Sequence, residues 1–262
     1  MKGDWRRKLP PGLQRMPTLY PTDRAEPQHR HGMSMLWRNS IISAVSGGFY
    51  AEFVILYLLA LGASPSIIGL RASINSAAAL AAPLLGAWLV ERTGQRKRIV
   101  LLSAGGFSRM ANLFMALIPF GLQGQAAVVA FVVLVAMQGF SDTLSGPAAN
   151  SLLGDIVPVW LRGRYLGNLM VAQNVAHMAI LPLAGLLVRQ VGGLQGYQLI
   201  WFLAALTGFW ATSYYARIQE PPSAEAQEQD TSAWPSFLKG WKDFAHDKRF
   251  VLFCAVIFMF NL

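Results

Sequence analysis

Six stretches of the chain are each long and apolar enough to cross a lipid bilayer as a helix. A helix needs about 20 apolar residues to span roughly 30 Å of hydrocarbon, and lipid offers no hydrogen-bond partner to an open, irregular backbone. The predicted spans cover residues 36–61, 66–90, 99–120, 126–153, 165–188 and 195–216. The sequence therefore predicts an all-α membrane protein.

The composition agrees with this class. Charged residues make up 13% of the chain, whereas soluble domains carry about 25%. The net charge of +9 comes from cations in loops and tails rather than on an aromatic-rich face, so it reports membrane topology and not a nucleic-acid partner. The single cysteine, Cys254, lies in an apolar run, so we expect no disulfide framework, no metal site and no cofactor.

The cations are distributed unevenly between the connections. The connections after the first, third and fifth spans hold one, Arg189. Those after the second and fourth spans hold Arg92, Arg96, Lys97, Arg98, Arg162 and Arg164. The positive-inside rule therefore places both ends of the six-span unit in the cytoplasm.

The chain divides by composition into four parts. Residues 1–35 are basic and proline-rich and are predicted to be a disordered cytoplasmic tail. Residues 36–217 form the six-helix domain, and residues 218–249 a polar cytoplasmic linker. Residues 250–262 are apolar again but reach only about 20 Å as a helix, so we expect the start of a seventh span in a truncated half of a larger protein.

An internal repeat is suggested by landmarks that recur after 99 residues. Asn75 falls on Asn174, and Gly86 falls on Gly185. Each match relates spans that run in opposite directions, which is typical of the inverted three-helix repeats of transporters. Chance agreement between two apolar sequences is the alternative.

The connection GAWLVERTGQRKR resembles the signature loop between helices 2 and 3 of the major facilitator superfamily, commonly G-x-L-a-D-R-x-G-R-R. The matching residues are Gly86, Glu91, Arg92, Gly94, Arg96 and Lys97. Three positions depart from the pattern: Ala87 stands where the leading glycine is expected, with Gly86 one residue early, Glu91 replaces Asp, and Gln95 replaces the first basic residue after the second glycine.

The connection between the fourth and fifth spans is similar to the D-x-x-P-x-x-x-R-G-R segment of the same family. Asp155, Pro158, Arg162, Gly163 and Arg164 are all in place. The resemblance implies a bundle of six transmembrane helices made of two inverted three-helix repeats, truncated before the second bundle. It also implies a secondary active transporter of a small solute by alternating access, with proton-coupled efflux among the implied activities.

The resemblance carries further expectations about partners and gating. The partners are the lipid bilayer, a small-molecule substrate and a missing C-terminal six-helix domain, and the location is the cell membrane with a cytoplasmic N-terminus. The two loops are expected to act as a cytoplasmic gate in which Glu91 pairs with Arg162 or Arg164. The alternative for Arg96, Lys97 and Arg98 is that they only fix topology.

Ionisable side chains inside the spans are costly in lipid and are candidates for function. The resemblance places Glu52 and Asp142 in a central cavity for a proton or a cationic substrate. Further candidates are Asn150, Asn174, His177 and Arg109. The alternatives are structural: Arg109 pairs with Asp142, Arg71 snorkels outward or pairs with Glu52, and His177 makes an interhelical hydrogen bond instead of relaying protons.

Two other classes of protein are alternatives to a transporter. One alternative is a membrane assembly or sensor protein that keeps the fold without transport. The two loop motifs speak against it, but His177 and Leu181, which replace two glycines of the G-x-x-x-G-P-x-x-G element of drug–proton antiporters, leave it open. An enzyme is not expected, because no nucleophile motif surrounds Ser145. A primary pump is not expected either, because no phosphate-binding G-x-x-x-x-G-K-[ST] loop is present.

Overall fold

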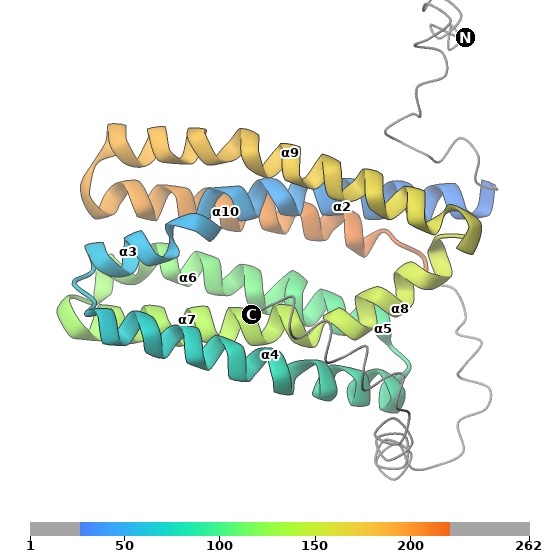
Figure 1. Ribbon diagram of the computed structural model, residues 1–262, viewed down its shortest axis with the longest axis horizontal. Helices are drawn as coiled ribbons and strands as arrows, with labels where there is room; N and C mark the ends of the chain where they lie inside the picture. Colours follow the sequence, from blue (N-terminus) through green and yellow to red (C-terminus); the bar gives the residue numbers. More distant parts are fainter. Residues whose placement is uncertain (1–26, 221–262) are drawn as a thin grey trace, which may run out of the picture.

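The computed structural model describes residues 27–220, and this part of the chain is a bundle of long helices joined by short connections. In chain order the elements are α2 Pro27–Tyr50, the 3-10 helix η3 Ala51–Phe53, α3 Val54–Ala60, α4 Pro65–Thr93, α5 Arg96–Val100, the π-helix η4 Leu101–Phe107, α6 Ser108–Gly121, α7 Gly124–Leu144, α8 Gly146–Ile156, α9 Val159–Val191 and α10 Gly193–Ala216. They lie in two layers, with α2, α9 and α10 in one and α4, α6 and α7 in the other (Figure 1).

Six segments of the described chain are long and apolar enough to cross a membrane, so the predicted number and order of spans are confirmed. Spans 2, 5 and 6 are the single helices α4, α9 and α10, whereas spans 1, 3 and 4 are each built from shorter pieces. The helices run past the predicted limits: the fourth, expected over 126–153, covers Gly124–Ile156. A membrane helix can continue beyond the hydrocarbon into the headgroup region.

Helix α2 begins earlier than expected. The sequence predicts a disordered tail that includes residues 27–35, but these residues are helical and pack against the rest of the bundle. Met33 is fully buried and its carbonyl accepts a hydrogen bond of 2.8 Å from the Tyr165 hydroxyl, while His29 Nδ1 lies 3.0 Å from the carbonyl oxygen of Ile156. These contacts order a polar segment that hydropathy alone assigns to a tail. Residues 1–26, the linker beyond residue 220 and residues 250–262 lie outside the described residues.

The packing follows the repeat inferred from the sequence. Span 1 packs against spans 5 and 6, span 4 packs against spans 2 and 3, and spans 3 and 6 pack against each other. Exchanging spans 1–3 with spans 4–6 leaves this pattern unchanged. Because spans related by the exchange run in opposite directions, the fold consists of two inverted three-helix repeats.

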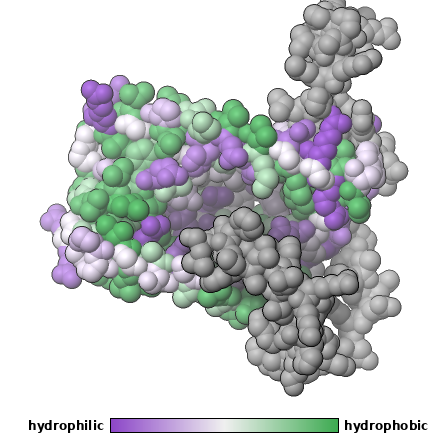
Figure 2. Space-filling view, viewed as in Figure 1, coloured by the Kyte–Doolittle hydropathy of each residue, from purple (hydrophilic) through white to green (hydrophobic). Residues whose placement is uncertain are grey.

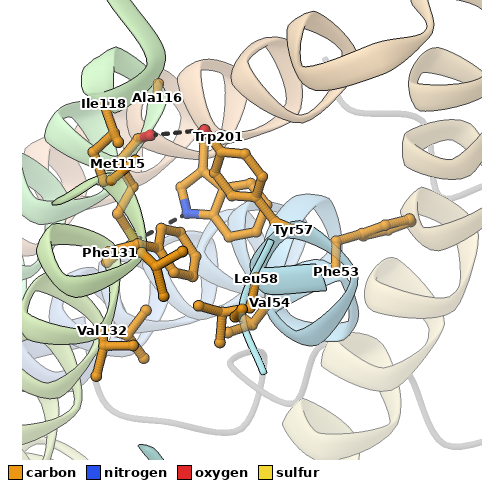
Figure 3. Close-up of a cluster of buried hydrophobic side chains, with 14 of the residues drawn as sticks. Phe53, Val54, Tyr57, Leu58, Met115, Ala116, Ile118, Phe131, Val132 and Trp201 are labelled. Atoms are coloured by element: carbon orange, nitrogen blue, oxygen red, sulfur yellow. Dashed lines mark hydrogen bonds between the residues drawn. The ribbon is translucent and has the colours of Figure 1, made fainter. Parts of the chain in front are cut away.

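Two apolar clusters hold the bundle together, one at each end. The first is aromatic (Figure 3): the Tyr57 and Phe131 ring centroids are 4.9 Å apart in an edge-on arrangement, and Tyr57 and Trp201 are 5.0 Å apart. Met115 joins this group, because its carbonyl accepts from the Tyr57 hydroxyl and its sulfur from the Trp201 indole. The second cluster contains Met33, Leu152, Val157 and Tyr165. A layer of polar side chains from spans 1, 3 and 4, described below as the polar belt, lies between the two clusters.

Candidate functional site

The end of the bundle that carries the α4–α5 and α8–α9 connections is called here the basic end. Helix α4 ends at Gly94, whose φ of 64° is left-handed and whose N–H donates to the Val90 carbonyl at 2.8 Å. Glycine adopts this conformation without steric cost. The reversal sends the chain directly into α5 and places Arg96, the first residue of α5, against α8.

Arg96 is the central charge of the basic end. Its side chain is only 5% exposed, and its Nη1 donates to the Asp155 carboxylate at 2.6 Å and to the Ser151 hydroxyl at 2.9 Å. Glu220, which follows α10, has its Oε1 3.5 Å from Arg96 Nε and 3.4 Å from the backbone nitrogen of Lys97. One cation therefore links α5, α8 and the segment after α10.

The expected pairing of Glu91 with Arg162 or Arg164 is not formed. Glu91 lies in the last turn of α4, before the reversal at Gly94, and is exposed with no ion pair within residues 27–220. Arg162 instead donates from Nη2 to the Gly154 carbonyl at 2.7 Å. This carbonyl belongs to the last turn of α8, where carbonyls lack intrahelical partners. The acid that forms an ion pair with the α4–α5 connection is therefore Asp155.

The other loop residues have separate surroundings. The Arg92 guanidinium lies 5.2 Å from the centre of the Trp88 ring, a cation–π contact within its own helix. Gly163 is exposed, whereas Lys97 and Arg164 are half-buried. The remaining glycine of the motif, Gly86, allows close packing, because a Cβ on it would collide with the backbone carbonyl oxygen at the end of α7.

Span 1 is interrupted at the residue predicted to be its functional acid. Helix α2 ends at Tyr50, and Glu52 occupies the 3-10 helix η3 before α3 resumes. The Glu52 carboxylate is 65% exposed and lies 3.9 Å from Nε2 of His177 on α9, which is 30% exposed. Two candidates chosen separately from the sequence thus meet across spans 1 and 5. Arg71, the alternative partner of Glu52, makes no ion pair with it.

A layer of polar side chains crosses the bundle between the two apolar clusters. This polar belt comprises Ser43, Ser46, Tyr50, Ser108, Arg109, Asn112, Gln138, Ser141 and Asp142. The amide nitrogen of Gln138 donates to the Tyr50 hydroxyl at 3.1 Å and to Asn112 Oδ1 at 3.0 Å. Spans 1, 3 and 4 are therefore joined by one buried side chain.

Arg109 and Asp142 face each other within the polar belt. Arg109 Nη2 donates to the Ser43 hydroxyl at 3.3 Å, and the Asp142 carboxylate lies within electrostatic reach of Arg109 and next to Ser108. Their nitrogen and oxygen atoms are not within 4.0 Å, so no direct ion pair forms between them in this structure. Arg109 Nε and Asn112 Nδ2 are buried and donate no hydrogen bond to a residue of the described bundle. These atoms leave hydrogen-bonding capacity for water or a solute.

Sequence reasoning missed most of this belt. Tyr50, Asn112 and Gln138 do not stand out in the sequence because none is ionisable at neutral pH. A signal was present, since Ser108 and Asn112, like Gln138 and Asp142, are four residues apart and share a helix face. The predicted cavity residues, Asn150 of α8 and Asn174 of α9, are exposed and make no hydrogen bond to these groups within the described bundle.

Polar and apolar residues are segregated on the surface as well. Figure 2 shows hydrophilic residues gathered along a hollow between the two layers of helices, while hydrophobic residues cover the outer flanks. Helices α4 and α9 are the least buried of the six spans. In the most apolar stretch of each helix, only 11% (α4) and 6% (α9) of the residues are buried in the described bundle. Both helices thus present long apolar faces outward.

Comparison with known proteins gives one result that covers most of the chain. The family described as Major Facilitator Superfamily matches residues 36–262. None of the curated proteins and none of the solved structures gives a significant match to the chain. The matched region begins at the start of the first predicted span, so the resemblance carried by the two loops extends over all six.

Proposed function

The chain belongs to the Major Facilitator Superfamily, and we propose that its six spans form the N-terminal half of a secondary active transporter that works by alternating access. Members of this family are membrane transporters, so the chain is an integral membrane protein and its ligand is a small solute. In the proposed cycle this half rocks against a second six-helix bundle, and a site between them opens to each side in turn. The apolar faces that α4 and α9 present outward are consistent with contact between these helices and the second bundle.

The proposed orientation places the basic end in the cytoplasm. The connections at this end hold almost all of the loop cations, and the positive-inside rule favours cytoplasmic placement of such loops. The start of α2 and the end of α10 both lie at this end of the bundle, and we propose the same side for the N-terminus and the linker. The proposed membrane is the cell membrane.

The ion pair of Arg96 and Asp155 is the observation that carries the gating proposal. It ties the α4–α5 connection to α8, while the half-exposed Asp155 side chain, 42% accessible, leaves the contact open to water. A pair of this kind can break and form during a rigid-body movement. Glu91, exposed and unpaired among the described residues, is free to contact the second bundle, and Arg92, Gly94 and Arg164 would shape that surface.

The pair of Glu52 and His177 is proposed as the coupling site. Irregular helix segments in transporters mark binding sites, and here the break in span 1 presents a carboxylate to an imidazole. A histidine can change charge near neutral pH. Asp142 and Arg109, which are half-buried in the polar belt, form a second proposed proton site. Asn150 and Asn174 are proposed as solute contacts.

The gate is tested by labelling a cysteine in the full-length protein. Asn174→Cys is introduced on a Cys254→Ser background, and its reaction with a membrane-impermeant thiol reagent is measured from each side. Adding Asp155→Asn should raise the labelling rate from the basic-end side, because the ion pair of Arg96 and Asp155 that closes the gate is weakened. Arg189→Gln, which removes a cation at the opposite end, is the control. Equal rates with and without Asp155→Asn would reject the gate.

The transport proposal can be tested before the solute is identified. A panel of solutes is screened for thermal stabilisation of the full-length protein, and the hits are assayed in proteoliposomes that contain a pH-sensitive dye. Solute-dependent proton flux is expected, and Glu52→Gln should abolish it while stabilisation by the solute persists. A protein that binds a solute without moving it would fit the assembly or sensor alternative instead.

A further inference from the structure

An apolar groove lies between α4, span 3 and α7, and Ser141 is the one member of the polar belt that lines it. Its volume is about 890 Å³. Ile74, Ala78 and Leu89 of α4 form one wall, and Leu102 and Phe107 of η4 form the other. The two η4 residues are five apart in a helix of i→i+5 bonds, so both can line the same side. Helix α7 closes the floor.

The groove runs along the helix axis for most of a membrane thickness. On α4 the lining extends from Ile74 to Thr93, which at 1.5 Å per residue is about 28 Å. One leaflet of hydrocarbon is about 15 Å deep, half of the 30 Å core. A complete acyl chain therefore fits along the groove.

The groove has one polar end, and it coincides with the basic end of the bundle. Thr93, Gln95 and Arg98 line it there. Arg98 is exposed, and its Nη1 donates to Gln95 Oε1 at 2.9 Å. No carboxylate within residues 27–220 forms an ion pair with Arg98, unlike Arg96, which Asp155 neutralises. Among residues 27–220 the Arg98 guanidinium therefore has no acidic partner and has N–H donors left for an anion.

We propose that the groove binds an anionic phospholipid, with one acyl chain between α4 and η4 and the headgroup phosphate on Arg98. Guanidinium groups bind phosphate oxygens through paired hydrogen bonds, and basic pockets at the membrane surface select anionic lipids. The interior of the groove matches a hydrocarbon chain, because its walls are mainly apolar, the Ser103 hydroxyl is already bonded to the Ile99 carbonyl at 2.6 Å, and Ser141 is only 7% exposed.

The dimensions suit a lipid chain better than a helix of another protein. A helix about 10 Å wide could rest on a groove of about 890 Å³ but would not enter it fully. An extended polypeptide would leave its backbone hydrogen-bonding groups unpaired between apolar walls. A lipid chain carries no such groups.

The test is the thermal unfolding of the full-length protein in detergent with added lipid. Dioleoylphosphatidylglycerol should raise the unfolding midpoint by roughly 5 °C at saturation. Dioleoylphosphatidylcholine and water-soluble glycerol phosphate should each give less than half of that shift. Arg98→Gln should remove the difference between the two lipids, whereas Arg189→Gln should preserve it.

A second pair of variants tests the acyl-chain site. Ala78→Phe fills the groove and should abolish retention of phosphatidylglycerol through gel filtration, measured as bound phosphorus. Ala79→Phe adds the same ring to the neighbouring exposed position and should retain the lipid. Each variant must first unfold within a few degrees of the parent without lipid. Equal shifts for both lipids, or lipid retention by Ala78→Phe, would overturn the proposal and leave the groove to a protein segment.

Discussion

Replacement of Asp155 by asparagine tests the main contact of the basic end directly. The change removes the charge that pairs with Arg96 and preserves the shape of the side chain. The guanidinium stays buried, with its side chain 5% exposed, and now lacks its closest acid. We expect a clear loss of stability from an exchange that alters only a few atoms.

The magnitude follows from the geometry of the pair. Removal of one partner from a fully buried pair costs about 3–5 kcal/mol, and a hydrogen bond to a charged group contributes about 1.5–3 kcal/mol. The lower range applies, because Asp155 is 42% exposed and Glu220 remains 3.5 Å from Arg96. A loss of about 2 kcal/mol is expected, which corresponds to a decrease of about 4–8 °C in the unfolding midpoint.

A double-mutant cycle separates the pair from other effects. Arg96→Gln removes the buried charge, so the double variant Arg96→Gln with Asp155→Asn should unfold at a higher temperature than Asp155→Asn alone. Thermal unfolding of the full-length protein in one detergent measures all four proteins. Glu91→Gln is the matched control, since this exposed acid has no ion pair among the described residues, and it should leave the midpoint unchanged.

Three results would refute this reasoning. If the two substitutions act additively, the side chains do not depend on each other. If Glu91→Gln destabilises the protein as much as Asp155→Asn does, the acid of the α4–α5 connection carries the contact in solution. A strong dependence on salt would also count against a buried cation, because only exposed pairs are well screened.

Three further predictions concern packing and the polar belt. Gly86→Ala should sharply reduce the yield of folded protein, measured by gel filtration, because its Cβ collides with a backbone carbonyl, while Gly163→Ala, with nothing within 4 Å, should not. Gln138→Ala should lower the unfolding midpoint by more than the loss of one hydrogen bond, since two partners lose their donor at once. Tyr165→Phe should cost about 1 kcal/mol in thermal unfolding through the bond to Met33, and an unchanged midpoint would show that water replaces it.

The architecture was largely predictable from the sequence. Lipid imposes so strong a demand on backbone hydrogen bonding that hydropathy alone gave six spans in the right order. The family assignment was also confirmed, because two loop patterns lay between the correct spans and the match covers residues 36–262. The contribution of residues 27–35 to α2 was missed, since their order depends on contacts such as His29 with Ile156.

The side-chain pairings were less predictable. A loop pattern gives spacing along the chain but not the direction of each side chain after a reversal. Gly94 turns the chain so that Arg96 points inward, whereas Glu91, on the other side of the turn, stays exposed. The contact between Glu52 and His177 joins spans far apart in sequence, and only the packing of span 1 on span 5 brings them together.

The polar belt has a consequence for how the spans assemble in the membrane. Lipid is as apolar as the side chains at a helix contact, so burial of leucine or valine hardly distinguishes one sliding position of two helices from another. Gln138 makes that distinction, because a slip of one helical turn, about 5.4 Å, would separate it from both Tyr50 and Asn112. The belt therefore sets the vertical register of spans 1, 3 and 4.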